Sequence, residues 1–160
     1  INDIKIENLW KNQNIDDENF KKLNNFYWFF TIDLKSSKKD TQKIISDWIK
    51  KNFKYNSKSW EFDTTSKRII AWLSNHKLTI DGSNKDYLKL FNRMIQKQTN
   101  HLINEINNSK KIDDKIIGCA AIILVGLSYK DEKNYLSYGL SLLKKISSLI
   151  LLHKNLLTVL

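Results

Sequence analysis

Apolar side chains recur at intervals of three and four residues along almost the whole chain, and this spacing most constrains its fold. Such intervals place side chains on one face of an α-helix, because a helix turns once every 3.6 residues. The 160 residues include no proline and four glycines, so helices can run without interruption while turn-rich β-folds lack their usual turn residues. The sequence therefore predicts an all-α protein.

Six helices are expected, beginning near residues 16, 37, 63, 84, 113 and 131. The short polar breaks between them favour antiparallel helical hairpins. The first helix is expected to run to about residue 35 and to bury the stripe Phe20, Leu23, Tyr27, Phe30 and Leu34. Ile116 to Leu127 is apolar all round, which predicts a helix covered on every side in a layered α/α array. At 12 residues this run is short of the roughly 20 that a membrane span needs.

The net charge of +10 raises the question of a nucleic-acid partner. Arg68 and Arg93 are the only arginines among 27 basic residues, and each half of the chain carries a net charge of +5. Lysine is joined by 18 Asn and 21 Ile, an excess that an AT-rich coding sequence explains. Nucleic-acid binding sites usually cluster their cations and use arginine for bidentate contacts, so this function is disfavoured.

Residue types with catalytic or metal-binding chemistry are scattered. His76, His101 and His153 lie far apart, without a spacing that would place two imidazoles on one helical face. Cys119 lies in the apolar helix and is expected to be a core thiol. Glycine-rich phosphate loops are absent from the sequence. We therefore predict no catalytic residue, no metal ligand and no cofactor in this chain.

The segment from Trp60 to Leu73 is the most informative. It places Arg68 and Trp72 four residues apart, on one face of an expected helix that begins shortly after Trp60. In one interpretation both tryptophans pack in the core and the Arg68 side chain extends from its boundary. In the other, an aromatic ring stacks on a sugar while the guanidinium pairs with a carboxylate or sulfate, so that Trp60, Arg68 and Trp72 bind substrate.

This segment resembles part of the N-terminal helical domain of the heparinase II/III-like polysaccharide lyases. There a Trp, a short polar linker and an Arg-hydrophobic-x-x-Trp helix follow in the same order. Four further segments of the chain resemble that domain, and the likeness covers about residues 15 to 148. These segments are Leu23-x-x-Phe26-x-Trp28-Phe29, Trp48-Ile49, the helix Tyr87 to Leu102 with Gln98 at its midpoint, and Gly118 to Leu127.

The resemblance implies part of an incomplete (α/α) toroid, normally followed by further helices and a β-sandwich domain. It implies three regions: a lead-in segment (1–15), a partial toroid domain (16–150) and a truncated or divergent tail (151–160). The implied activity is β-elimination on acidic, uronate-containing polysaccharide. The family's catalytic Asn, Tyr and His match no position here, so this piece is expected to be inactive alone. Its implied partners are the polysaccharide and the missing parts of the same protein, and family members of this kind are periplasmic.

Two alternatives from other functional classes stay open. The first is a non-enzymatic α-helical protein-interaction module, which is favoured if the chain is natively complete and should bury a partner on the Leu149 to Leu160 surface. Less favoured is a basic nucleic-acid-binding domain. A lyase piece should bind uronate polymers weakly until the rest of the protein is restored.

Overall fold

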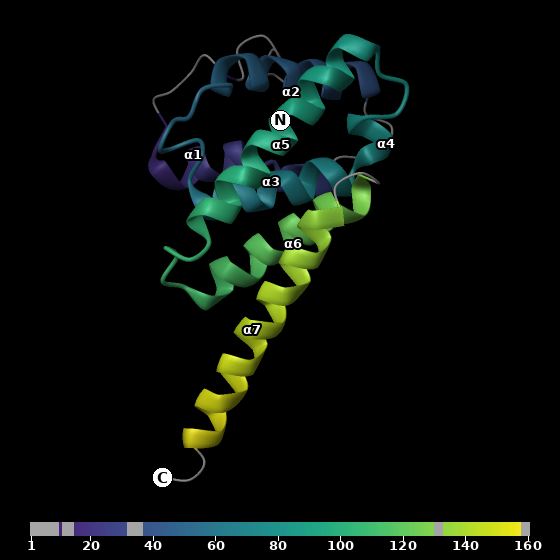
Figure 1. Cartoon of the computed structure of the whole chain (residues 1–160). Coiled ribbons are helices and arrows are strands. Elements are labelled where there is room, and N and C mark those ends of the chain that lie inside the picture. The colour runs from purple at the N-terminus through teal and green to yellow at the C-terminus, as the bar shows by residue number, and fades with distance from the viewer. Residues whose placement is uncertain (1–9, 11–14, 32–36, 130–132, 158–160) are drawn as a thin grey trace.

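The computed structural model (Figure 1) describes residues 10, 15–31, 37–129 and 133–157, with side chains as far as residue 151. Every element in these ranges is a helix, which confirms the all-α class. The elements are α1 (Asp17–Asn24), the 3-10 helix η2 (Tyr27–Thr31), α2 (Lys38–Asn52), α3 (Phe62–Ser74), α4 (His76–Thr79), α5 (Lys85–Glu105), α6 (Ile112–Ser128) and α7 (Lys133–Leu157). Within the described ranges none of these helices is long and apolar enough to cross a bilayer.

The prediction of one continuous helix from residue 16 to about residue 35 is wrong, because α1 ends at Asn24. Phe26 adopts a φ of 59°, a left-handed conformation that ends the helix. Two side-chain hydrogen bonds stabilise the break. The amide of Tyr27 donates to Asn25 Oδ1 at 2.9 Å, and Trp28 Nε1 donates to the carbonyl of Leu23 at 3.1 Å.

The break changes which aromatic rings enter the core. Phe26 and Phe29 are buried, whereas Tyr27 and Phe30 of the predicted stripe are exposed. Leu34, the last residue of that stripe, lies outside the described residues. In a continuous helix with the predicted stripe, Tyr27 and Phe30 would face the core instead of Phe26 and Phe29. The left-handed turn at Phe26 therefore decides which aromatic rings are buried.

The turn before α5 combines a left-handed glycine with a side-chain cap. Gly82 has a φ of 72°, the positive value expected for a glycine at this turn. The residue that caps α5 is Asn84. Its side chain accepts a hydrogen bond from the amide of Tyr87 at 2.8 Å.

Helix α3 lies in the middle of the molecule (Figure 1). It contacts α1, η2, α4 and α5 as well as α6, while α2 packs against α4 and α5. Large aromatic side chains fill the space between α2, α3 and η2. The ring of Phe26 lies edge-on to both Trp48 and Trp72, with centroids 6.0 and 5.2 Å away. Edge-to-face pairs of this kind add stability beyond the apolar area that they bury.

Helices α6 and α7 form an antiparallel pair with closely approaching backbones. Gly126 faces the backbone of Leu136, and Gly118 faces the ring of Phe62, so a Cβ at either glycine would meet those atoms. The expectation that α6 is covered on every side is wrong. Ile116 and Leu127 are exposed, with 37% and 65% of their surfaces accessible.

Helix α7 extends well beyond the rest of the molecule (Figure 1). It runs without a break through residue 151, where the sequence analysis places the start of a truncated or divergent tail. The packing of these helices defines neither a closed nor an open ring, so the toroid remains a proposal.

Candidate functional site

The helix that carries Arg68 begins with a side-chain cap. Glu61 accepts hydrogen bonds at one carboxylate oxygen from the amide of Thr64 (2.9 Å) and from its hydroxyl (2.7 Å). Lys21 lies 3.5 Å from the other oxygen. Burial alone would raise the pKa of Glu61, but the Thr64 hydrogen bonds and Lys21 outweigh it, and this pKa lies below its ordinary value. The negative charge also suits the positive end of the α3 dipole.

Arg68 is fully buried, and its guanidinium donates to four oxygens. Nη1 donates to the backbone carbonyl of Asn24 at 2.7 Å, and Nε donates to Gln98 Oε1 at 3.3 Å. Nη2 donates to the carbonyl of Ser59 at 3.0 Å and to Thr65 Oγ1 at 3.1 Å. A planar donor with fixed directions can join these three parts of the chain, whereas a lysine ammonium would not match their geometry.

Trp48 forms one wall of the Arg68 site. The guanidinium carbon lies 4.0 Å from the centre of the indole ring, within the range of a cation–π contact. Trp48 Nε1 donates to Asn24 Oδ1 at 2.8 Å. Asn24 therefore holds both the cation and the ring on which it stacks, and this connects α1 with α2 and α3.

All four acceptors of Arg68 are neutral oxygens. Burial lowers the pKa of Arg68 to about 9, and the negative charge of Glu61 opposes this shift. The guanidinium is therefore charged at neutral pH. Gln98 Nε2 and Ser59 Oγ, which belong to two of the residues that hold it, are buried without a hydrogen-bond partner in the described part of the chain.

The three residues predicted to bind substrate all lie in the core. Arg68 and Trp72 are inaccessible to solvent, and Trp60 is 3% exposed. The structure brings Arg68 and Trp72 together at Trp48, whose ring centroid is 5.6 Å from that of Trp72. Trp60 packs elsewhere, beside His101, and its Nε1 donates to the carbonyl of Asn52 at 2.9 Å. This placement favours the packing interpretation, and substrate contact by the three residues stays a prediction without geometric support.

The sequence interpretation missed the partners of Arg68. Asn24 and Gln98 lie 44 and 30 residues from it along the chain, so no local spacing connects them. The sequence signal that could have found these partners is a polar residue within an apolar helical face. Gln98 is a polar residue on the apolar side of α5, and Asn24 ends α1 with its side chain buried.

An open pocket of about 280 Å³ lies between α5 and the corner where α6 approaches α7. Its floor is apolar and its walls are basic, amide and phenolic. The lining residues are Lys89, Asn92, Arg93, Ile95, Gln96, Val125, Tyr129 and Tyr135. Burial raises the pKa of Tyr129 to about 12, so its hydroxyl is protonated at neutral pH and donates to Asn92 Oδ1 at 2.9 Å. The pocket thus combines an apolar surface with basic, amide and phenolic groups.

Nucleophilic and metal-binding groups form no site in the described residues. Cys119 is buried in α6, and burial raises the pKa of its thiol, which keeps it protonated. Among the described residues, no three His, Cys, Asp or Glu side chains gather closely enough to hold a metal ion.

Comparison of the chain with known protein families, with curated protein sequences and with solved structures finds no match.

Proposed function

We propose that this chain is an N-terminal helical part of a heparinase II/III-like enzyme that acts on acidic polysaccharide by β-elimination. One observation carries the proposal. The separate sequence segments that resemble this family all meet in one buried unit, most of them at Arg68. Trp48 and Gln98, which lie in two of these segments, both contact Arg68 in a third.

Each segment has a contact in this unit. The first supplies the Asn24 carbonyl, the second the Trp48 ring and the helix α5 the Gln98 side chain, all in contact with Arg68. The fifth segment meets the third through Gly118, which packs against Phe62 at the start of α3. Trp48, Arg68, Gln98 and Gly118 are matched positions of the resemblance, whereas Asn24 is an unmatched position of the first segment.

In this proposal the chain scaffolds a reaction that residues outside it perform. β-Elimination removes the proton α to a uronate carboxylate, and the charge that develops must be neutralised by positioned donors. In this proposal the described side chains take no catalytic role. We call Arg68 with its contacts Asn24, Trp48 and Gln98 the Arg68 unit. Its role is to hold α1, α2, α3 and α5 at fixed positions, so that further toroid helices can complete a substrate groove.

The exposed apolar side of α6 agrees with such further helices. Ile112, Ile116 and Leu127 recur at intervals that place them on one face of α6, and all three are exposed. A toroid continues by adding a helical hairpin to the last one, so in this proposal α6 and α7 are neighbours of the next pair.

The test is to sequence the gene beyond this chain, produce the whole encoded protein and assay it on uronate polymers. The expected product is an unsaturated uronide, which absorbs in the ultraviolet. A downstream region without a β-rich domain, or a whole protein that forms no uronide from any acidic polysaccharide, would contradict the proposal.

A protein-interaction module is the second candidate, and α7 favours it. Leu149 and Leu151 near its end are 58% and 61% exposed on opposite sides of the helix, so both sides of this end offer apolar surface to a partner. A binding protein recovered with the natively complete chain, and lost with Leu149→Lys and Leu151→Lys, would support this candidate over the lyase.

A further inference from the structure

Helix α6 carries an apolar strip on its exposed side. The strip consists of Ile112, Ile116, Ala120 and Leu127, which recur at intervals of four and seven residues and are all exposed. We call these four residues the α6 strip. From Ile116 to Leu127 the sequence contains no charged, amide or hydroxyl side chain. Apolar surface of this extent is unfavourable in water, so the strip is suited to a covering surface.

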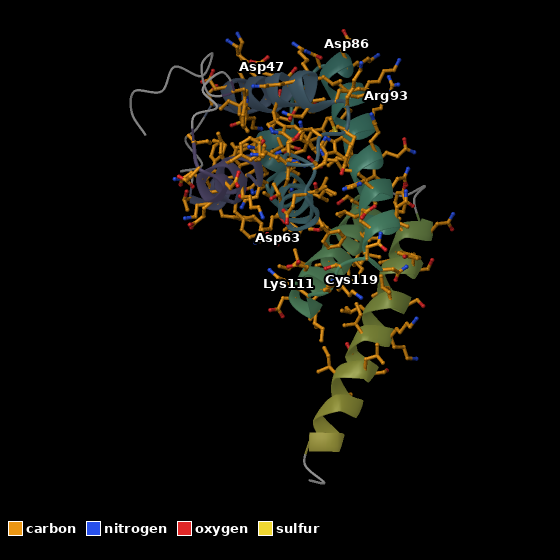
Figure 2. The ribbon with its side chains drawn as sticks, turned by 90° about the vertical axis from the view of Figure 1, so that its left-hand side faces the viewer. Asp47, Asp63, Asp86, Arg93, Lys111 and Cys119 are labelled. Carbon is orange, nitrogen blue, oxygen red and sulfur yellow. The ribbon has the colours of Figure 1, made fainter. Side chains whose placement is uncertain are left out.

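The opposite side of α6 packs on the core. Gly118 lies two residues before Ala120, which places it about 200° around the helix, and it faces the Phe62 ring of α3. Helix α5 contacts α6 as well. Figure 2 labels Lys111 and Cys119 along α6 and shows α7 beside this helix, continuing past Lys111. The α6 strip therefore faces away from α3.

Helix α7 extends the same exposed face. Tyr135 donates to Asn100 of α5, so this flank of α7 faces the body of the molecule. Gly139 faces Ile123 of α6. Leu140 lies about 140° around α7 from Tyr135, with Gly139 between them, and it is 51% exposed. Leu140 therefore continues the α6 strip on the neighbouring helix.

The size of this face suits a reversible contact between two proteins. Ile112 to Leu127 spans about 22 Å at 1.5 Å per residue, and two packed helices are about 19 Å wide. The flat area is thus about 420 Å², and a pair of such faces would cover about 840 Å². Side chains protrude, so the accessible area is larger and lies near the roughly 1,000 Å² that specific interfaces exceed.

The apolar residues of α6 are arranged almost symmetrically about Ala120. Ile116 and Leu124 lie four residues on either side of it, and Ile112 and Leu127 lie eight and seven residues away. A two-fold axis at Ala120 would place Ile112 of each copy beside Leu127 of the other, as a closed dimer requires. The short side chain of Ala120 would let the two helices approach closely where they cross.

We propose that this chain forms a two-fold symmetric dimer in which the α6 strip packs antiparallel against the same strip of a second copy. Ala120 lies at the axis, and Leu140 extends the contact at its edge. Removal of the strip from water drives the association. The net charge of +10 on each copy opposes it only at long range, because the strip itself is uncharged.

A second copy fits this face better than an unrelated partner, because only a second copy makes use of the symmetry about Ala120. In the proposed lyase, further helices of the same protein would lie against α6. The dimer is a property of this chain by itself and does not depend on any reaction with polysaccharide.

Sedimentation equilibrium of the whole 160-residue chain tests the dimer at about 0.15 M salt, where repulsion between copies is screened. With an interface of this size, we expect a dissociation constant on the order of 10 to 100 μM. Ala120→Glu should weaken self-association at least about tenfold, because two carboxylates would meet at the axis. Ser141→Glu, at an exposed position on α7, is the matched control and should weaken it less than about twofold.

Cysteine crosslinking tests the antiparallel arrangement. Ile112→Cys and Leu127→Cys each place a thiol more than about 20 Å from the same thiol of the second copy. Oxidised separately, neither variant should form a disulfide-linked dimer; oxidised as a mixture, they should, because the two positions lie side by side. The native Cys119 is buried and common to all samples. Circular dichroism checks that every variant keeps the helical fold.

Several results would overturn the inference. A chain that stays monomeric at every concentration would leave the face to further helices or to another partner. Equal losses in Ala120→Glu and Ser141→Glu would show that charge rather than position controls association. Crosslinking of Leu127→Cys to itself would exclude the antiparallel arrangement. A whole protein that forms no uronide would leave all these measurements unchanged, so the lyase proposal and the dimer fail separately.

Discussion

Arg68 connects several segments of the chain through hydrogen bonds of its guanidinium group. Its four hydrogen bonds reach carbonyls and side chains from three different parts of the chain, in an interior without a neutralising carboxylate in contact. A buried charge costs free energy unless its donors are satisfied and its surroundings are polarisable. Here the oxygens and the Trp48 ring meet that requirement, and the position accepts few alternatives.

The two arginines of the chain allow a matched test of this dependence. Arg68→Lys should lower the free energy of unfolding by about 3 kcal/mol, because the ammonium leaves buried carbonyls unpaired. Arg93→Lys, at an exposed position, should change it by less than about 0.5 kcal/mol. Urea unfolding followed by circular dichroism measures both. Equal stability of the two variants would show that Arg68 is not a structural centre.

The lowered pKa of Glu61 predicts that the free energy of unfolding depends on pH. Its pKa in the folded chain lies below the ordinary value, so ionised Glu61 stabilises the fold at pH values above the pKa of the unfolded chain. This contribution is lost as the pH falls through the lower, folded-state pKa. Glu61→Gln should therefore cost about 1 kcal/mol at neutral pH and less in acid.

Urea midpoints at neutral pH and at about pH 3 test this expectation, because the second value lies below the ordinary carboxyl pKa. Asp47→Asn, at a partly exposed position beside Lys50, serves as the control. A Glu61→Gln cost that is the same at both pH values would contradict an ionised cap.

At the scale of the element, the contact of α6 with α7 determines whether Gly126→Ala raises or lowers the stability of the chain. Alanine is preferred to glycine inside a helix by about 1 kcal/mol, so Gly126→Ala would stabilise α6 if it stood alone. In the structure its methyl group would meet the backbone of Leu136. The variant should instead lower stability by about 1 to 3 kcal/mol.

Gly139→Ala is the companion variant. Its nearest neighbour is the Ile123 side chain, which can shift more easily than a backbone, so its cost should be smaller. Thermal unfolding of both variants measures the order. A stabilised Gly126→Ala would mean that α6 and α7 do not pack as described.

The sequence predicted most helices because their apolar stripes span several turns, and α2, α5 and α6 begin within two residues of the expected positions. It failed at Phe26, because a positive φ at a bulky residue leaves no trace in hydrophobic spacing. The sequence also did not predict the full burial of Arg68, for a different reason. The partners Asn24 and Gln98 come together only through tertiary packing.

At the scale of the molecule, stability should be unevenly distributed. The Arg68 unit joins four helices, whereas α7 packs mainly on α6 and reaches beyond it (Figure 1). Local opening requires less free energy where few buried contacts are lost. The two ends of the molecule should therefore differ in how readily their backbones open.

Amide hydrogen exchange of the 160-residue chain measures this difference. Amides of α3 around Arg68 and Trp72 should exchange slowest, near the rate of global unfolding, because both side chains are fully buried. Amides of α7 after Ile146 should exchange much faster, since Leu149 and Leu151 bury little surface. Uniform protection along α7 that falls on dilution would mean that a second copy covers these leucines. Uniform protection at every concentration would contradict the described exposure of α7 itself.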